Sequence, residues 1–296
     1  MILCDFERRG SVRAEMSREV FRSSKMISFL SLRLGTLSSL SVAARRMVID
    51  WLIAVREALA ALMFPWSCPV CGEEGSGSPF CRSCRQALME QSARSVEWAC
   101  PRCALSAGPF ADLRGGCAVC RDRSLGFDAA LALGPYKGDI QDLCLRLKHE
   151  SNAWLAPWLS DLFVEARRDA ISHLPRDAWV VPVPLHWRRR WWRGYNQAEA
   201  LAHGLARRLN LPVHQPLRRL VATRQLAYKG RTARAEIMHG AFRARPNRRL
   251  VGRTVLLIDD VLTTGATCGD AARALKKAGA ARVIVVVIAR TERQTL

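Results

Sequence analysis

Residues Val255–Thr267 read VLLIDDVLTTGAT, and this stretch predicts the fold of the chain. Four apolar residues, Val255–Ile258, indicate a buried parallel strand. Two adjacent carboxylates, Asp259 and Asp260, stand at its end, and a helical pattern over Gly269–Ala278 follows. The connecting loop should therefore lie at the carboxyl end of a strand and at the amino end of a helix. Open α/β sheets bind their ligands at such positions.

The composition of this loop suits a phosphate monoester. Hydroxyls of Thr263, Thr264 and Thr267, together with free backbone N–H groups, can surround the anion. Gly265 allows the backbone to approach it closely, and Ala266 adds no bulk. The carboxylates repel a phosphate but suit the hydroxyls of an attached sugar, or a divalent metal. The alternative is a buried strand with a polar turn and a well-capped helix.

The thirteen residues resemble the phosphoribosyl diphosphate (PRPP) signature of type I phosphoribosyltransferases. The resemblance implies that Asp259 and Asp260 are the catalytic acids and hold the ribose 2′- and 3′-hydroxyls. It also implies that residues 263–267 hold the 5′-phosphate. Mg²⁺ would accompany PRPP and bridge its diphosphate and ribose hydroxyls.

Length and charge set the broad limits. The 296 residues are enough for about two domains. Lysine and arginine number 46 against 26 acids, so a formal charge of +20 favours polyanions, anionic lipid or phosphorylated substrates. An excess of arginine also follows from genome composition, so charge supports a nucleic-acid partner only weakly. No apolar run reaches the roughly 18 residues of a transmembrane segment.

The spacing of the cysteines indicates metal-binding sites. Eight of the eleven form four CxxC pairs: Cys68/Cys71, Cys81/Cys84, Cys100/Cys103 and Cys117/Cys120. Two such turns complete a tetrahedral Cys₄ zinc site, and four thiolates leave no open position for catalysis. The spacing favours two structural zinc ions, one held by the first two pairs and one by the last two, with crossed pairing left open. Reduced thiols in this number predict a cytoplasmic protein.

The domain boundaries follow from these features. Residues 1–46 are rich in serine and arginine and indicate a disordered tail or a mis-assigned translation start. Apolar residues at helical spacing over 47–64 predict a helix that packs on its own domain, a membrane or partner surface being the alternative. We therefore expect a helix plus double zinc ribbon over 47–122 and a phosphoribosyltransferase-like domain over 123–296.

Strands and helices alternate in the second domain, which predicts an α/β fold with a central parallel sheet. The expected strands cover Phe127–Leu133, Trp179–Pro184, Pro212–Val221 and Arg282–Ile288, and the expected helices cover Asp139–Lys148, Trp154–Ile171 and Asn196–Leu209. Lys148 has two equally plausible roles. It either stabilises the end of its helix through the helix dipole or contacts a phosphate.

A basic segment follows the strand at Trp179–Pro184. It contains Arg188, Arg189, Arg190 and Arg193 among several aromatic residues. These guanidinium groups suit a diphosphate leaving group. Alternating arginines and aromatic rings also suit single-stranded DNA, while the alternative is an ordinary solvated face. The polar loop over 223–234 is long enough to be a lid.

The order of features resembles the ComF family. The shared motifs are the CxxC pairs, LRLKH (145–149), VPVPLH (181–186), RGYNQAE (193–199), TRQL (223–226), and the phosphate loop with the later ART (289–291). The resemblance implies an N-terminal zinc ribbon, a C-terminal phosphoribosyltransferase-like domain and a role in bacterial DNA uptake. Single-stranded DNA and proteins of the uptake machinery would then be partners. The alternative is an active enzyme that transfers phosphoribosyl from PRPP to an unidentified amine or base.

Overall fold

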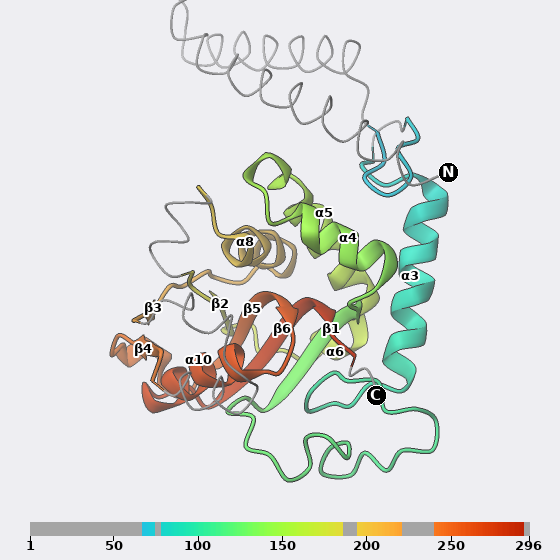
Figure 1. Cartoon of the computed structure of the whole chain (residues 1–296). Coiled ribbons are helices and arrows are strands. Elements are labelled where there is room, and N and C mark those ends of the chain that lie inside the picture. Colours follow the sequence, from blue (N-terminus) through green and yellow to red (C-terminus); the bar gives the residue numbers. More distant parts are fainter. Residues whose placement is uncertain (1–66, 75–77, 186–193, 221–239, 293–296) are drawn as a thin grey trace, which may run out of the picture. The chain divides into compact units, whose positions relative to one another are not determined.

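A computed structural model describes residues 67–74, 78–185, 194–220 and 240–292 (Figure 1). Within these ranges, Cys68–Gly72 and the residues from Pro79 onward belong to one compact unit. The predicted tail (1–46), the predicted helix (47–64), the four arginines of the basic segment and the predicted lid (223–234) lie outside the described residues.

A parallel sheet forms the centre of this unit. Its four strands are β1 (Ala129–Pro135), β2 (Trp179–Pro182), β5 (Thr254–Leu262) and β6 (Arg282–Arg290), arranged in the order β1-β6-β5-β2. Every neighbouring pair is parallel. The predicted central parallel sheet is confirmed. β6 reads RVIVVVIAR and is buried at all positions except Arg282, as expected for a β-branched strand with layers on both faces.

Helices cover both faces of the sheet. One face packs against α3 (Arg82–Glu97), α4 (Gly138–Arg146), α5 (Leu155–Ala166) and α8 (Gln197–Leu209). The other packs against α10 (Ala266–Lys277), the antiparallel pair β3 (Leu217–Arg219) and β4 (Phe242–Ala244), and the 3₁₀ turn η4 (Arg248–Leu250). Because side chains alternate along a strand, Leu256 and Ile258 of β5 face the first layer, whereas Val255 and Leu257 face the second.

Several predicted boundaries differ from the structure. β5 does not end at the two carboxylates but continues through them to Leu262, and α10 begins at Ala266 rather than Gly269. The candidate strand over 212–221 is limited to the three residues of β3. These differences bring the carboxylates into the sheet, leave Thr263 and Thr264 in a short turn, and place Thr267 in the first turn of α10.

The predicted helix Trp154–Ile171 is two helices, α5 and α6 (Arg168–Ser172), which meet at Arg167. The Arg167 side chain is buried, and it donates to the carbonyl oxygens of Ala132 and Leu133 on β1, each at 2.7 Å. Burial lowers the pKa of this guanidinium to about 10. The break therefore comes from a tertiary contact with β1, which the periodicity of the helix does not contain.

Candidate functional site

The two carboxylates of β5 point to opposite faces of the sheet. The thiol of Cys268, in the first turn of α10, lies 3.6 Å from Asp259 Oδ2. On the other face, Gln197 Nε2, at the start of α8, donates to Asp260 Oδ2 at 3.2 Å. The N–H groups of Asp260 and Val261 donate to the preceding carboxylates at 2.9 and 2.8 Å. The acids are thus held by their own strand and by the starts of two helices.

Burial and like charge act on Asp259. Its pKa is raised well above the usual aspartate range, first because burial disfavours the charged form and then because Asp260 lies beside it. Burial and the Asp259 charge likewise raise the pKa of the Cys268 thiol. A cation or several hydroxyl donors would favour the ionised form of Asp259. Carboxylate oxygens are the ligands that Mg²⁺ prefers, so the donor set fits a magnesium-bound diphosphate ester.

Residues 263–267, termed the phosphate loop, comprise the turn Thr263–Gly265 between β5 and α10 and the first two residues of α10. Thr263 and Thr264 are exposed, and Gly265 adopts a left-handed conformation with φ of 82°. The Ala266 N–H donates to Thr264 Oγ1 at 3.3 Å. The N-cap residue Gly265 has no side chain that could cap α10, and the Gly269 N–H donates to Gly265 O at 2.7 Å. The N–H groups of Thr267 and Cys268 have no hydrogen-bond partner among the described residues and remain available to an anion.

A second helix begins beside the carboxylates. Asn196 caps α8: its side chain accepts from the Ala198 N–H at 3.2 Å and donates to Val183 O at 3.2 Å. The next residue, Gln197, is only 5% exposed, and its Oε1 has no hydrogen-bond partner among the described residues. A buried acceptor without a partner is unfavourable, and a ligand hydroxyl would satisfy it. Sequence reasoning missed Gln197, although it lies in the RGYNQAE motif.

Lys148 follows Leu147, the C-cap residue of α4, and is half-buried. Its backbone N–H closes a turn onto Leu145 O at 3.2 Å. Burial raises the pKa of the Cys144 thiol, the Asp260 charge raises it further, and the Lys148 charge acts in the opposite direction. Lys148 and Asp260 therefore act on the same buried thiol, on the face that carries α4 and α8. Helix capping and phosphate contact both remain predictions for this lysine.

The cysteines form two separate groups. The first cluster is Cys68, Cys71, Cys81 and Cys84, and the second cluster is Cys100, Cys103, Cys117 and Cys120; in each, the ligand atoms lie within 4.8 Å of one another. The structure thus groups the first two CxxC pairs together and the last two together, which is the grouping that the spacing favours. Sγ–Sγ distances of 3.6 Å recur in both clusters. Four thiolates around one zinc ion are about 3.8 Å apart, whereas a disulfide measures roughly 2.05 Å.

The electrostatics of the clusters also fit a cation. Burial raises the pKa of Cys68 and Cys100, but backbone N–H groups outweigh it and bring each to about 7. The pKa of Cys103 is raised, first by burial and then by the charge on Cys100. The negative charge of one thiolate in a cluster thus disfavours deprotonation of the next thiol. A bound divalent cation would offset this repulsion and favour the deprotonated form of all four thiols. Two structural zinc ions fit these residues.

Comparison with known proteins identifies the domain that contains β5 and the phosphate loop. The family model "Phosphoribosyl transferase domain" matches residues 196–296. Competence protein F of Haemophilus influenzae is 31% identical over 180 residues, which cover 59% of this chain and 78% of that protein.

DNA utilization protein YhgH of Escherichia coli K12 is 30% identical over 209 residues, 69% of this chain and 89% of that protein. Competence protein ComFC of Bacillus subtilis is 40% identical over 102 residues, 34% of this chain and 40% of that protein. The chain belongs to the ComF family, with a double cysteine-cluster module ahead of a phosphoribosyltransferase domain. Across the described ranges, no helix has the length and apolar character needed to cross a bilayer.

Proposed function

We propose that this protein binds PRPP at the phosphate loop and acts in bacterial DNA uptake by binding single-stranded DNA in the cytoplasm. The observation that carries the PRPP proposal is the placement of Asp259 and Asp260 between the starts of α8 and α10, two residues before a phosphate loop in which glycine is the N-cap residue of α10. The DNA proposal draws on the names of the relatives, competence and DNA utilization proteins, and on the charge of +20.

In this proposal each group of residues has a distinct task. Thr263, Thr264 and Thr267 donate hydroxyl hydrogen bonds to the 5′-phosphate, and the first-turn N–H groups of α10 add the helix dipole. Asp259 and Asp260 accept from the ribose hydroxyls. Gln197 orients Asp260, and its buried oxygen accepts one further hydroxyl. Bound Mg²⁺ would neutralise charge on the diphosphate.

Calorimetric titration of PRPP with Mg²⁺ into zinc-replete protein tests this site. We expect binding by the wild type and none by the Asp259→Asn/Asp260→Asn variant, which keeps the size of both side chains. Thr264→Val should weaken binding about tenfold through loss of one hydrogen bond to a charged group. Absence of binding to the wild type would overturn the proposal.

The raised pKa of Asp259 gives the binding a pH dependence. A raised pKa means that Asp259 holds its proton above the pH at which an ordinary aspartate loses it. If hydroxyls and Mg²⁺ select the ionised form, binding releases this proton and strengthens as pH rises toward the raised pKa. Calorimetry in two buffers of different ionisation enthalpy should detect proton release in the wild type and less in Asp259→Asn.

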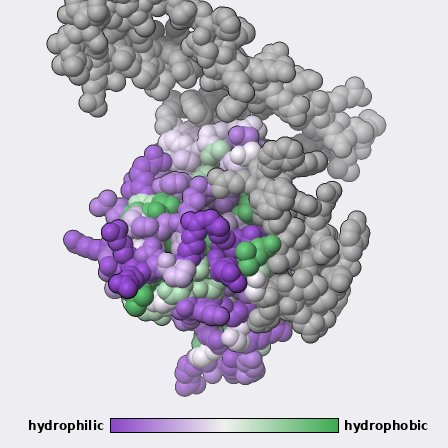
Figure 2. Space-filling view, turned by 90° about the vertical axis from the view of Figure 1, so that its left-hand side faces the viewer, coloured by the Kyte–Doolittle hydropathy of each residue, from purple (hydrophilic) through white to green (hydrophobic). Residues whose placement is uncertain are grey.

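A basic groove supports the DNA proposal. A cavity of about 690 Å³ lies along α10, β4 and η4, and its cations are Arg243, Arg248, Arg273 and Lys277. Asp270 is the acid that lines it, and this buried carboxylate already accepts from the N–H groups of Gly240 and Phe242, each at 3.0 Å. The face seen in Figure 2 is mostly hydrophilic. Cations of this kind follow a nucleic-acid backbone.

The salt dependence of binding to a fluorescent oligothymidine tests the groove. Replacing Arg243 and Lys277 by alanine should weaken binding for all base sequences and lower the slope of log K against log salt by about 1 for each phosphate that is no longer neutralised. Arg176→Ala, which removes an exposed arginine outside the groove, is the control. An unchanged slope in the double variant would exclude the groove and leave Arg188, Arg189, Arg190 and Arg193 as the candidates.

The second candidate function is an active phosphoribosyltransferase, and both carboxylates beside the phosphate loop favour it. An amine or ring nitrogen would attack C1′ of PRPP, form the new C–N bond and displace diphosphate. The protein would contribute mainly positioning and charge stabilisation. Diphosphate release in the presence of amines and nucleobases tests this candidate, with Asp259→Asn/Asp260→Asn as the blank. Release no faster than the blank would leave PRPP as a bound ligand only.

A further inference from the structure

Arg290, the last residue of β6, joins two segments that are far apart in the sequence. It is 8% exposed, and its Nε donates to Cys103 O at 2.9 Å. Its Nη1 donates to Leu262 O at 2.8 Å and also to Thr263 O. One planar guanidinium therefore holds a carbonyl of the second cluster and two carbonyls at the start of the phosphate loop. Arginine suits this task because its donors have a fixed planar geometry.

The chain that leaves the second cluster also packs against the start of α10. A Cβ atom on Gly126 would lie 2.4 Å from Gly269 O, and one on Gly269 would lie 2.3 Å from Leu125 O. Both distances are shorter than any normal contact, so only glycine allows this approach. The Phe127 ring lies 3.6 Å from the position of a Cβ on Gly265. Two independent sets of contacts thus link this part of the chain to the phosphate loop and α10: Arg290 bonds the carbonyl of Cys103, and Leu125–Phe127, which follow the second cluster, pack against Gly265 and Gly269.

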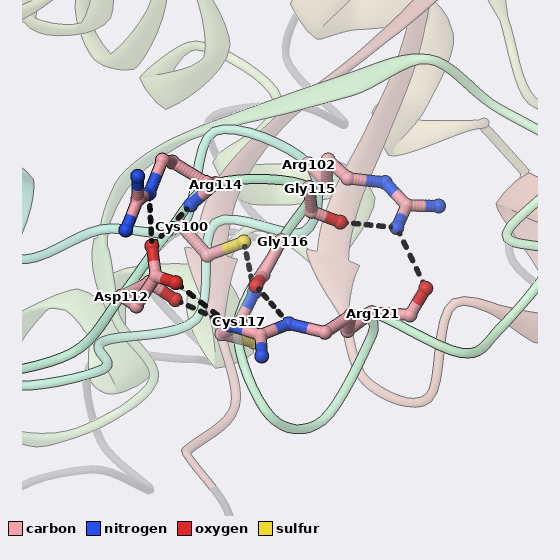
Figure 3. A network of polar contacts seen from close by, with 8 residues as sticks. All are labelled: Cys100, Arg102, Asp112, Arg114, Gly115, Gly116, Cys117 and Arg121. Carbon is pink, nitrogen blue, oxygen red and sulfur yellow. Dashed lines mark hydrogen bonds and ion pairs between the residues drawn. The ribbon is translucent and has the colours of Figure 1, made fainter.

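The second cluster and its loops, residues 98–123, form a unit that we call the second cysteine module. Arg102, between two of the ligands, donates to Gly115 O at 2.8 Å and to Arg121 O at 3.2 Å (Figure 3). It also donates to Cys120 O at 3.0 Å. Its other amino group reaches Arg123 O at 3.2 Å. The two CxxC turns are therefore held together by the hydrogen bonds of Arg102 as well as by the grouping of their four cysteine thiols. A change at the cluster would move Cys103 and Leu125 together.

The first cluster has different neighbours. Cys81 is the N-cap residue of α3, and its carbonyl accepts from the Arg85 N–H at 2.9 Å. Its thiol lies 3.2 Å from Ser83 Oγ. These contacts stabilise the start of α3 rather than the turn after β5.

We propose that the second cysteine module forms one wall of the phosphate site and that Arg290 is the positioning residue between them. Integrity of the second cluster then sets the shape of the phosphate loop and its affinity for a phosphate ester, whereas the first cluster does not. The choice of PRPP as the ligand rests on the proposed function. The claim that the second cysteine module and Arg290 hold the phosphate loop does not depend on it.

Four variants test the proposal. Cys117→Ser/Cys120→Ser removes two ligands of the second cluster and leaves Cys103 in place, and Cys68→Ser/Cys71→Ser does the same to the first cluster. Arg290→Lys keeps all eight cysteine ligands and the positive charge but removes the planar guanidinium group that donates to several carbonyl oxygens. Arg282→Lys, at the exposed start of the same strand, is its control. Zinc content, PRPP affinity with Mg²⁺, and hydrogen exchange of the amides in 263–269 are measured for each.

We expect Arg290→Lys to retain both zinc ions, to exchange faster over 263–269 and to bind PRPP at least about tenfold more weakly. Cys117→Ser/Cys120→Ser should lose one zinc ion and show both effects. Cys68→Ser/Cys71→Ser should also lose one zinc ion but keep wild-type exchange over 263–269 and wild-type PRPP affinity. Arg282→Lys should behave as the wild type in all three measurements. Wild-type exchange in Arg290→Lys, or equal effects of the two cluster variants, would overturn the inference. If the second-cluster variant does not fold, Arg290→Lys decides alone.

The two proposals fail in different ways. If the wild type does not bind PRPP, the proposed function falls, but hydrogen exchange still reports whether the second cysteine module holds the phosphate loop. If the wild type binds PRPP and Arg290→Lys binds equally well with unchanged exchange, the proposed function stands and the inference falls.

Discussion

The two cysteine clusters share a ligand set but differ in burial and in neighbours. Cys71 of the first cluster is exposed, and Cys81 and Cys84 are partly exposed, whereas all four ligands of the second cluster are buried. The first lies at the start of α3. The second contacts Arg290 through Cys103 O, and the segment that follows it, Leu125–Gly126, packs against the first turn of α10. Identical motifs thus have different structural consequences, which depend on the residues that surround each metal site.

The largest expected difference between the clusters is in stability. Cys117→Ser/Cys120→Ser should lower the free energy of unfolding by at least ~4 kcal/mol, because a structural zinc site contributes most of the folding energy of a small module. Cys68→Ser/Cys71→Ser should cost roughly half as much, since its site is partly open to water. Urea unfolding with zinc present measures both. Equal losses of unfolding free energy in the two variants would mean that the two clusters do not differ in their contribution to stability.

The next effect concerns the arginine inside each pair of ligands. Arg102→Ala should destabilise the protein by about 2–3 kcal/mol, because four carbonyl oxygens lose a donor. Arg82 also lies between two ligands, Cys81 and Cys84 of the first cluster, but it is exposed, so Arg82→Ala is the control and should leave unfolding unchanged. Similar thermal midpoints for the two variants would contradict the role of Arg102.

Two glycines of the same conformation give a finer test. Gly72, beside the first cluster, and Gly126, after the second, have φ of 79° and 83°. A Cβ on Gly72 meets nothing within 4 Å, whereas one on Gly126 meets Gly269 O at 2.4 Å. Gly72→Ala should cost ~1 kcal/mol through backbone strain alone. Gly126→Ala should cost about 2 kcal/mol more, because the backbone of α10 must move. Equal costs by thermal unfolding would mean that the close approach is not needed.

The smallest effect is expected at the surface of the second cysteine module. Asp112 forms ion pairs with Arg114 at 3.2 Å and Arg121 at 3.8 Å, and these side chains are largely exposed. The Arg114 N–H and guanidinium, followed by Arg121, lower the pKa of Asp112. Asp112→Asn should leave the thermal midpoint within error at physiological salt. A clear loss would mean that charge, rather than metal and Arg102, holds the module.

Sequence patterns predicted the parts of the site that are contiguous in the chain. Asp259, Asp260 and the phosphate loop lie within one strand–turn–helix unit, and ligand spacing predicted the pairing of the cysteines. The local sequence is enough to predict such a unit because neighbouring residues determine the strand, the turn and the start of the helix.

The remaining parts depend on contacts between distant segments. Gln197 reaches Asp260 only because β2 and β5 are adjacent in the sheet. Arg290 reads as the end of an apolar strand, and only the packed structure brings it to Cys103 and Leu262. α3 was not predicted at all. Its sequence has few apolar residues, and the packing of Leu88 and Ser92 decides its place. Tertiary packing overrides local preference in such helices.

The strand order also constrains how this domain is assembled during synthesis. β6 is translated after β1, β2 and β5, yet it lies between β1 and β5 in the sheet. The ribosome therefore releases both cysteine clusters and the phosphate loop before the strand that joins the two halves of the sheet exists. Contacts of such large sequence separation form late and slowly. Arg290, at the end of β6, is synthesised after all of these segments, and its hydrogen bonds to Cys103 and Leu262 can form only then. The nascent chain can therefore bind its metal ions before the phosphate loop takes its final conformation.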